Sequence, residues 1–285
     1  MRVGRIPYIN CYPVYGAIDR GIVPLDGELV DGVPTALNRR MRDGTLDVSV
    51  ISAVEYAADA SRYVLLPDLG ITSDGPVRSV MMFSRRPAQE LAGERVLVSK
   101  SSMTSVALLE LLFEHVWRAR PQFVPADAEI ADVQAFGREP HEARLVIGDA
   151  ALLLNTTVAG GDAGALAPRT GYVHAYDLGA EWKRWTGLPF VFAVWVAQRT
   201  ADVRQALAVH GRLITSRDWG LQHLDALAAQ ASLATGVAKP VCLEYLSGLD
   251  YRLSYSHLAG LTEFFRRLVA AGRVPDGSLR FLPAA

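Results

Sequence analysis

The first third of the chain alternates short apolar stretches with stretches of helical spacing. Apolar and polar residues alternate over 46–51, which is typical of a strand with one buried face. Pro34–Met41 has helical spacing, and proline is favoured in the first turn of a helix. Val3–Ile9 and Tyr63–Leu66 are further apolar segments of strand length. Strands that alternate with helices predict a parallel sheet with helices on its faces.

A second set of the same kind begins near Arg95. A strand predicted over Val96–Val98 leads into a serine-rich segment and then into a helix. Leu145–Ile147 and Phe190–Ala197 are two more strand candidates, and beyond Thr200 the pattern is helical to the end. The last of these helices has one apolar face, formed by Leu258, Leu261, Phe264, Phe265 and Leu268.

Two separate sets of strands and helices predict an α/β protein with two lobes and a ligand cleft between them. Residues 1–82 and 195–285 form lobe one in this prediction, and residues 83–194 form lobe two. Each lobe is expected to contain a central, mostly parallel sheet. The extended stretches near 77–84 and 192–197 are expected to connect the lobes as hinge strands. A Gly- and Ala-rich stretch, 159–167, is typical of a surface loop.

Composition and charge argue against two classes of partner. Half of the 285 residues are hydrophobic, which is enough for a large core. Lysine and arginine number 29 against 30 acidic residues, so the formal net charge is -1. The sequence also has no dense basic run that could bind the phosphate backbone of a nucleic acid. No stretch reaches the roughly 18–20 consecutive apolar residues that cross a bilayer. We therefore expect neither nucleic acid nor a membrane as a partner.

Cysteine and histidine usage argues against a disulfide framework and against a metal site. The two cysteines, Cys11 and Cys242, are too few for a disulfide framework, and no apolar signal segment opens the chain, so we expect a cytoplasmic protein. No histidine adjoins Cys11, so a buried core residue is favoured over a nucleophile. The histidines do not pair at metal-ligand spacing, and we predict no metal. They are His115, His141, His174, His210, His223 and His257.

Hydroxyl and amide side chains follow the predicted strands, where open α/β sheets bind ligands. They are Asn10, Ser52, Ser79, the cluster Ser99–Ser105, and Asp149. The cluster carries four serines and a threonine at a strand-to-helix junction. A helix cap needs only one hydroxyl, so the surplus favours an anion site that combines hydroxyls with free helix amides.

Several of these residues also have a purely structural interpretation. Ser52 and Glu55 form a capping-box pattern, which by itself explains both residues. Asp149 either caps the helix after it or binds a substrate hydroxyl. Asn10 is also a common type of turn residue. From the residues alone, the ligand is only a small organic anion.

Motifs along most of the chain resemble the chorismate dehydratase family of the futalosine route to menaquinone. The resemblance rests on Gly4–Pro13, Leu46–Val48, Ser52–Tyr56, Ser79–Val80, the serine cluster, Ile147–Leu152, Asp177–Gly179 with Trp182, and Thr186–Ala193. It implies a periplasmic-binding-protein type II fold used as a cytosolic enzyme. It also implies loss of water from chorismate to give 3-[(1-carboxyvinyl)oxy]benzoate, without a cofactor.

The implied reaction assigns roles to the candidate residues. Because strong bases are scarce after the strands, we expect the enolpyruvyl carboxylate of the substrate to remove the proton. Asn10 is expected to be catalytic, orienting that carboxylate or the leaving hydroxyl. The substrate-binding residues are expected to be Ser52, Ser79, Ser102, Thr104, Ser105 and Asp149.

Two alternatives stay open at this point. The nearer one is 1,4-dihydroxy-6-naphthoate synthase, an enzyme of the same pathway and fold that needs a base; a histidine in lobe two would favour it, and only His141 is placed for this. The other is a non-catalytic protein that binds a small organic anion. The sequence does not decide whether the chain forms a homodimer.

Overall fold

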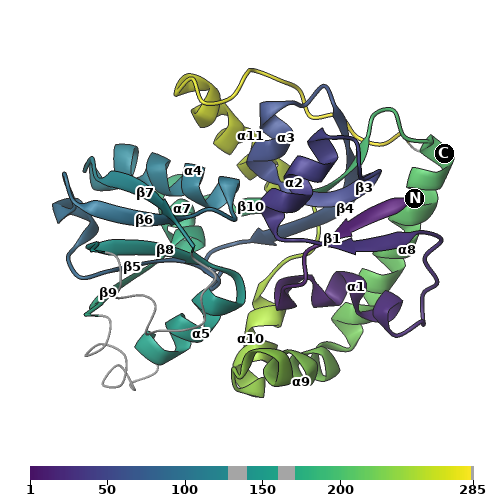
Figure 1. The fold of residues 1–285 in the computed structure, drawn as a ribbon, viewed down its shortest axis with the longest axis horizontal. Helices are drawn as coiled ribbons and strands as arrows, with labels where there is room; N and C mark the ends of the chain where they lie inside the picture. The colour runs from purple at the N-terminus through teal and green to yellow at the C-terminus, as the bar shows by residue number, and fades with distance from the viewer. Residues whose placement is uncertain (128–139, 160–170, 284–285) are drawn as a thin grey trace.

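Two five-stranded sheets lie side by side, one in each lobe (Figure 1). The computed structural model describes residues 1–127, 140–159 and 171–283. Most of the loop predicted at 159–167 lies outside these residues. The two-lobed α/β architecture predicted from the sequence is confirmed.

The first sheet contains four strands from the N-terminal part of the chain and one, β10, that follows lobe two in the sequence. Its spatial order is β2 (Glu28–Asp31), β1 (Arg2–Arg5), β3 (Val48–Ser52), β10 (Phe190–Gln198) and β4 (Tyr63–Ser73). β1 pairs with β2 and β3 in parallel, whereas β10 runs antiparallel to β3 and β4. Every residue of β3 is buried, as expected for a central strand covered on both faces.

The second sheet has the same mixed character. Its spatial order is β7 (Gln122–Ala126), β6 (Arg95–Ser99), β8 (Ala143–Ile147), β5 (Val80–Ser84) and β9 (His174–Asp177). β6 pairs in parallel with β7 and β8, and β5 pairs antiparallel with β8 and β9. In each sheet four of the five strands run in the same direction and only β10 or β5 runs against them, so the prediction of mostly parallel sheets is confirmed. The strands next to each crossing between the lobes, β5 and β10, run against their neighbours.

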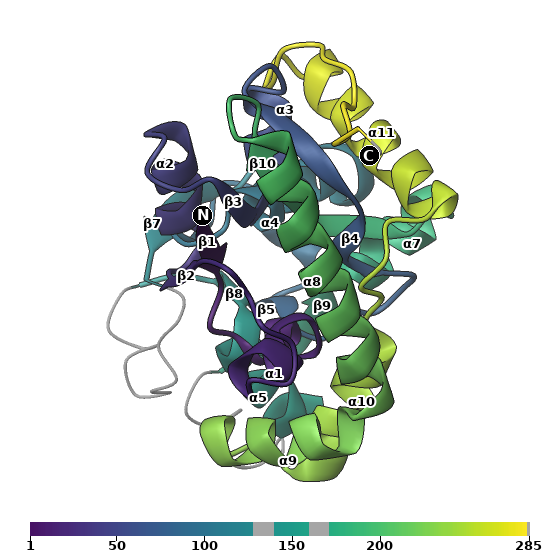
Figure 2. The same cartoon turned by 90° about the vertical axis from the view of Figure 1, so that its right-hand side faces the viewer.

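Lobe one is covered by helices from the two ends of the chain. They are η1 (Ile9–Cys11), α1 (Tyr12–Asp19), α2 (Pro34–Arg42), α3 (Ala53–Ala58), α8 (Val203–Gln222), α9 (Leu224–Thr235), α10 (Lys239–Gly248) and α11 (Tyr255–Ala270). The helical pattern predicted beyond Thr200 is confirmed. Figure 2 shows the long helix α8 beside α1. Glycine is required where α8 packs against α1, because a Cβ atom on Gly220 would lie 2.2 Å from the carbonyl oxygen of Pro13.

The helices of lobe two pack on the second sheet. They are η2 (Ala88–Glu90), α4 (Met103–Leu112), the π-helix η3 (Phe113–Trp117), α5 (Gly148–Ala159) and α7 (Leu178–Thr186). The chain passes between the sheets at 74–79 and again through α7. The limits of the two lobes as folding units stay a prediction.

Candidate active site

A small cavity lies between the lobes, at the carboxyl ends of β3, β6 and β8. Its volume is about 60 Å³, well below the roughly 300–1,000 Å³ of ordinary ligand pockets, so the cleft must widen to admit a metabolite. No Asp, Glu, Lys, Arg or His among the described residues lines it. Its polar lining consists of Tyr8, Asn10, Ser52, Ser79, Ser102 and Ser105.

Ser52 faces the cavity from lobe one. The capping box predicted for it is wrong, because its side chain makes no capping hydrogen bond. Glu55 instead lies 2.8 Å from Arg42 and accepts a hydrogen bond from the Tyr63 hydroxyl. The Oγ atom of Ser52 accepts a hydrogen bond from Asn38 Nδ2 at 3.2 Å, and its backbone N–H donates to Asn38 Oδ1 at 3.1 Å.

Ser102 and Ser105 face the cavity from the start of α4 in lobe two. Ser102 is the N-cap, because its Oγ accepts a hydrogen bond from the Ser105 N–H at 3.2 Å. The Ser102 hydroxyl donates in turn to Ser105 Oγ at 2.8 Å. Thr104 does not line the cavity; its Oγ1 accepts a hydrogen bond from the Val54 N–H at 3.2 Å, across the cleft.

Ser79 lies where the chain first crosses between the lobes. It is buried, and its Oγ accepts a hydrogen bond from the Tyr245 hydroxyl at 2.7 Å. Its own contact with the Val77 carbonyl is long, at 3.4 Å. The carboxylate of Asp177 fixes the backbone of this connecting segment, because it accepts hydrogen bonds from the N–H groups of Val77 and Arg78 at 3.0 and 2.6 Å.

Asn10 lies in the short helix η1 at the edge of the cavity. Its Oδ1 atom is buried and has no hydrogen-bond partner among the described residues. An amide oxygen is an acceptor, and a desolvated acceptor without a partner is unfavourable, so this atom is ready to accept a hydrogen bond from a ligand. The neighbouring Cys11 is buried, as predicted, and burial raises the pKa of its thiol. Its role as a core residue is confirmed.

Asp149 lies beside the cavity rather than in its lining. It occupies the first turn of α5, where its Oδ1 accepts a hydrogen bond from the Ile9 N–H at 3.2 Å. Burial raises the pKa of Asp149 to about 6, although the Ile9 N–H opposes this shift. The contact joins lobe two to the turn that carries Asn10. Its contact with a substrate stays a prediction, as does the ligand role of Thr104.

The structure adds two residues that the sequence analysis missed, Asn38 and Tyr245. Asn38 is fully buried on the inner face of α2, between the buried residues Leu37 and Met41. A polar side chain on the apolar face of a helix was the available signal. Tyr245 lies in α10, 166 positions from its partner Ser79, and no local pattern indicates such a contact.

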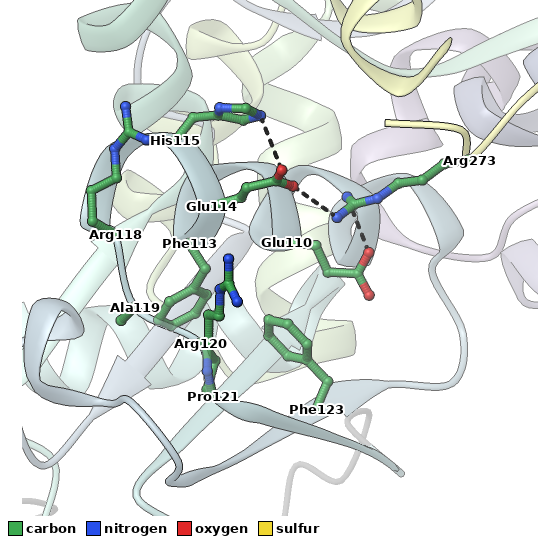
Figure 3. A pocket seen from close by; sticks show the side chains of 10 residues that line it. All are labelled: Glu110, Phe113, Glu114, His115, Arg118, Ala119, Arg120, Pro121, Phe123 and Arg273. Carbon is green, nitrogen blue, oxygen red and sulfur yellow. Dashed lines mark hydrogen bonds and ion pairs between the residues drawn. The ribbon is translucent and has the colours of Figure 1, made fainter. Parts of the chain in front are cut away.

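A larger pocket of about 700 Å³ lies beside η3 and β7 (Figure 3). Four of its titratable groups contact one another, whereas Arg118 and Arg120 also line it. Arg273 lies 3.1 Å from Glu110 and 3.4 Å from Glu114, and Glu114 also lies 3.8 Å from His115. Figure 3 shows Arg273 and Glu114 as the centre of this network. The volume alone therefore does not identify the larger pocket as the functional site.

Within 1–127, 140–159 and 171–283, no helix is long and apolar enough to cross a membrane. Over the same residues, His, Cys, Asp and Glu side chains do not gather in groups of three or more that could hold a metal ion.

Two lobes with a polar cavity between them define the class of fold to which this chain belongs, that of the periplasmic binding proteins. Protein AF1704 from Archaeoglobus fulgidus has a similar fold, with a TM-score of 0.77 at 19% identity, over 96% of this chain and 98% of that one. The alkanesulfonate-binding protein SsuA from Xanthomonas axonopodis is also similar, with a TM-score of 0.66 at 14% identity, over 98% and 95%.

Within this class, the chain belongs to the menaquinone biosynthesis family, whose model matches residues 1–270. It is 30% identical to the chorismate dehydratase of Thermus thermophilus over 268 residues, which is 92% of this chain and 95% of that protein. It is 31% identical to the 1,4-dihydroxy-6-naphtoate synthase of the same organism, over 70% of this chain and 66% of that protein. The family expected from the motifs is confirmed, and the chain is an enzyme of menaquinone biosynthesis.

Proposed function

We propose that this protein is a chorismate dehydratase, a cofactor-independent lyase that acts in the cytoplasm. The observation that carries the proposal is the lining of the cavity, which among the described residues combines hydroxyl groups and one unpaired amide oxygen with no strong acid or base. Similarity to the Thermus chorismate dehydratase over nearly the whole of both chains supports it. The product is 3-[(1-carboxyvinyl)oxy]benzoate.

The reaction breaks two bonds of chorismate, C3–H and C4–O, and releases one water. The C3 proton is acidified by conjugation to the C1 carboxylate, and formation of the aromatic ring drives the elimination. The enolpyruvyl carboxylate of the substrate takes the C3 proton, the C–H electrons form the new double bond, and the same proton leaves with the C4 hydroxyl as water. The protein mainly orients these groups, which can supply several kcal/mol.

The side chain of Asn10 supplies a hydrogen-bond acceptor for the leaving hydroxyl group. Its unpaired Oδ1 accepts the hydrogen of the C4 hydroxyl, which turns the lone pairs of that oxygen toward the proton it must receive. Ser52, Ser79 and Ser105 donate hydrogen bonds to the substrate carboxylates. Asp149 holds the turn that carries Asn10 through the Ile9 N–H, and it is not the base in this mechanism.

The naphthoate synthase alternative has less support. Its expected base, His141, is buried against the Tyr172 hydroxyl and is not part of the cavity lining. This chain matches the naphthoate synthase of Thermus thermophilus over only 66% of that protein's length. Similarity to the sulfonate-binding proteins is only 14% identity and therefore supports the fold alone.

The test is incubation of the purified protein with chorismate, without added cofactor, followed by chromatography and mass spectrometry. We expect an enzyme-dependent product that is lighter than chorismate by one water. Unchanged chorismate in the presence of folded protein would rule out the proposal, and cyclic futalosine-derived compounds would be tested next. A preparation made in the same way from cells that do not express the protein controls for contaminating activity.

A further inference from the structure

We propose that Tyr245 and Asn38 are positioning residues that make Ser79 and Ser52 hydrogen-bond donors toward the cavity. Each of the two acts from behind a serine that lines the cavity, and neither lines it itself. The consequence is a cavity that selects carboxylates although no basic side chain lines it in the described part of the chain. The identity of the carboxylate rests on the proposed function; the direction of the hydrogen bonds does not.

Tyr245 can only be the donor in its bond with Ser79. Its hydroxyl is buried, burial raises the pKa of the phenol, and among the described residues Ser79 Oγ is the only acceptor at hydrogen-bond distance. Ser79 therefore accepts from Tyr245 and keeps its own hydrogen for another partner. The available protein acceptor, the Val77 carbonyl, lies 3.4 Å away, which is at the limit of a hydrogen bond. A carboxylate in the cavity is the better acceptor.

The orientation of Asn38 follows from the Ser52 backbone. The Ser52 N–H is a donor, so the Asn38 atom 3.1 Å away must be the amide oxygen. The other side-chain atom of Asn38 is then the NH₂ group, which donates to Ser52 Oγ at 3.2 Å. Because one lone pair of Ser52 Oγ accepts this hydrogen bond, the hydroxyl hydrogen of Ser52 is directed away from Asn38.

The same logic applies to Ser105 in the other lobe. The Ser102 hydroxyl accepts from the Ser105 N–H, so its hydrogen goes to Ser105 Oγ and leaves the Ser105 hydrogen unused. Three hydroxyl donors from two lobes and the hinge thus line one cavity. Preoriented donors of this kind stabilise an anion without reorganising when it binds.

The first test is Tyr245→Phe, which removes one hydroxyl and keeps the ring. Ser79 can then turn its hydrogen away, and we expect the KM for chorismate to rise by about three- to tenfold while kcat stays within about twofold. Tyr251→Phe is the matched control, because the Tyr251 hydroxyl is buried without a hydrogen-bond partner among the described residues. It should leave KM unchanged.

A double-mutant cycle separates positioning from packing. If Tyr245 acts through Ser79, then Tyr245→Phe should have no further effect on KM in a Ser79→Ala background. Equal effects in both backgrounds, or an unchanged KM in the single variant, would overturn the proposal for Tyr245.

Asn38→Asp inverts the polarity behind Ser52. The aspartate still accepts from the Ser52 N–H, but it replaces the NH₂ donor by an acceptor and draws the Ser52 hydrogen away from the cavity. We expect KM to rise by about tenfold or more, with the melting temperature recorded to identify unfolding. A folded variant with unchanged KM would overturn the proposal for Asn38.

A substrate-independent readout distinguishes failure of this inference from failure of the proposed function. If the wild-type protein does not convert chorismate, the proposed function fails, and the same variants are compared by thermal shift with benzoate as the probe. A smaller stabilisation by benzoate in Tyr245→Phe than in Tyr251→Phe would still support the positioning role. Equal stabilisation would reject it.

Discussion

The pocket beside η3 and the cavity between the lobes differ in size and in the character of their linings. The pocket beside η3 measures about 700 Å³ and contains a network of acidic and basic groups, whereas the cavity between the lobes measures about 60 Å³ and is lined by neutral side chains. In the larger pocket, Arg273 contacts Glu110 and Glu114, so these charges already have partners. In the smaller cavity, hydrogen-bonding capacity is left over. This unused capacity, enclosed by both lobes, is better evidence of a ligand site than volume or charge.

The largest effect should come from Asn10→Ala. This variant removes the unpaired acceptor for the leaving hydroxyl, and we expect kcat to fall on the order of a hundredfold, with a smaller change in KM. Steady-state kinetics with chorismate measure both constants. Cys11→Ala, the adjacent buried position, is the control and should keep kcat near the wild-type value. Full turnover by Asn10→Ala would show that its catalytic assignment is wrong.

A moderate effect is expected for Ser105→Ala. The change removes one donor to a substrate carboxylate, so KM should rise by about tenfold with little change in kcat. Ser101→Ala is the matched control, because Ser101 lies in the same segment but not in the cavity lining. If both variants behave alike, the cavity is not where the carboxylate binds.

Asp149→Asn should have a smaller effect on turnover and a measurable effect on stability. Asparagine keeps an acceptor for the Ile9 N–H, so we expect kcat to fall by no more than about threefold. Loss of all turnover with substrate binding retained would instead identify Asp149 as the base.

The stability of the same variant has a defined pH dependence. The pKa of Asp149 is about 6 in the folded protein, above the roughly 3.9 of an unfolded chain. The folded state therefore binds the proton more tightly, and this group costs stability progressively as the pH rises from about 4 through about 6. The melting temperature of Asp149→Asn, minus that of the wild type, should therefore increase as the pH rises over this range. A constant difference across the range would contradict this shift.

The smallest effect is expected in the larger pocket. Arg120 is exposed there, and Arg120→Ala should change kcat and KM for chorismate by less than about twofold. A large loss of activity, with the melting temperature preserved, would show that the larger pocket is needed for activity and would contradict the choice of the smaller cavity as the ligand site.

The sequence predicted those features that depend on neighbouring residues. Alternation of strands and helices indicated two lobes, and the serine-rich segment after β6 contains the N-cap Ser102. The cavity brings together five of the predicted residues, namely Asn10, Ser52, Ser79, Ser102 and Ser105. Strand ends and helix starts are local features, and the carboxyl ends of strands in an open sheet share one edge.

The tertiary structure decided which partner each polar group binds. Ser52 and Glu55 match a capping box in sequence, but Glu55 contacts Arg42 and Tyr63, and Ser52 binds Asn38. Donor direction at Ser79 depends on Tyr245, which is distant in the chain. A hydroxyl can donate or accept, so its sequence position does not determine its polarity. Only the groups packed around it in the folded protein determine this.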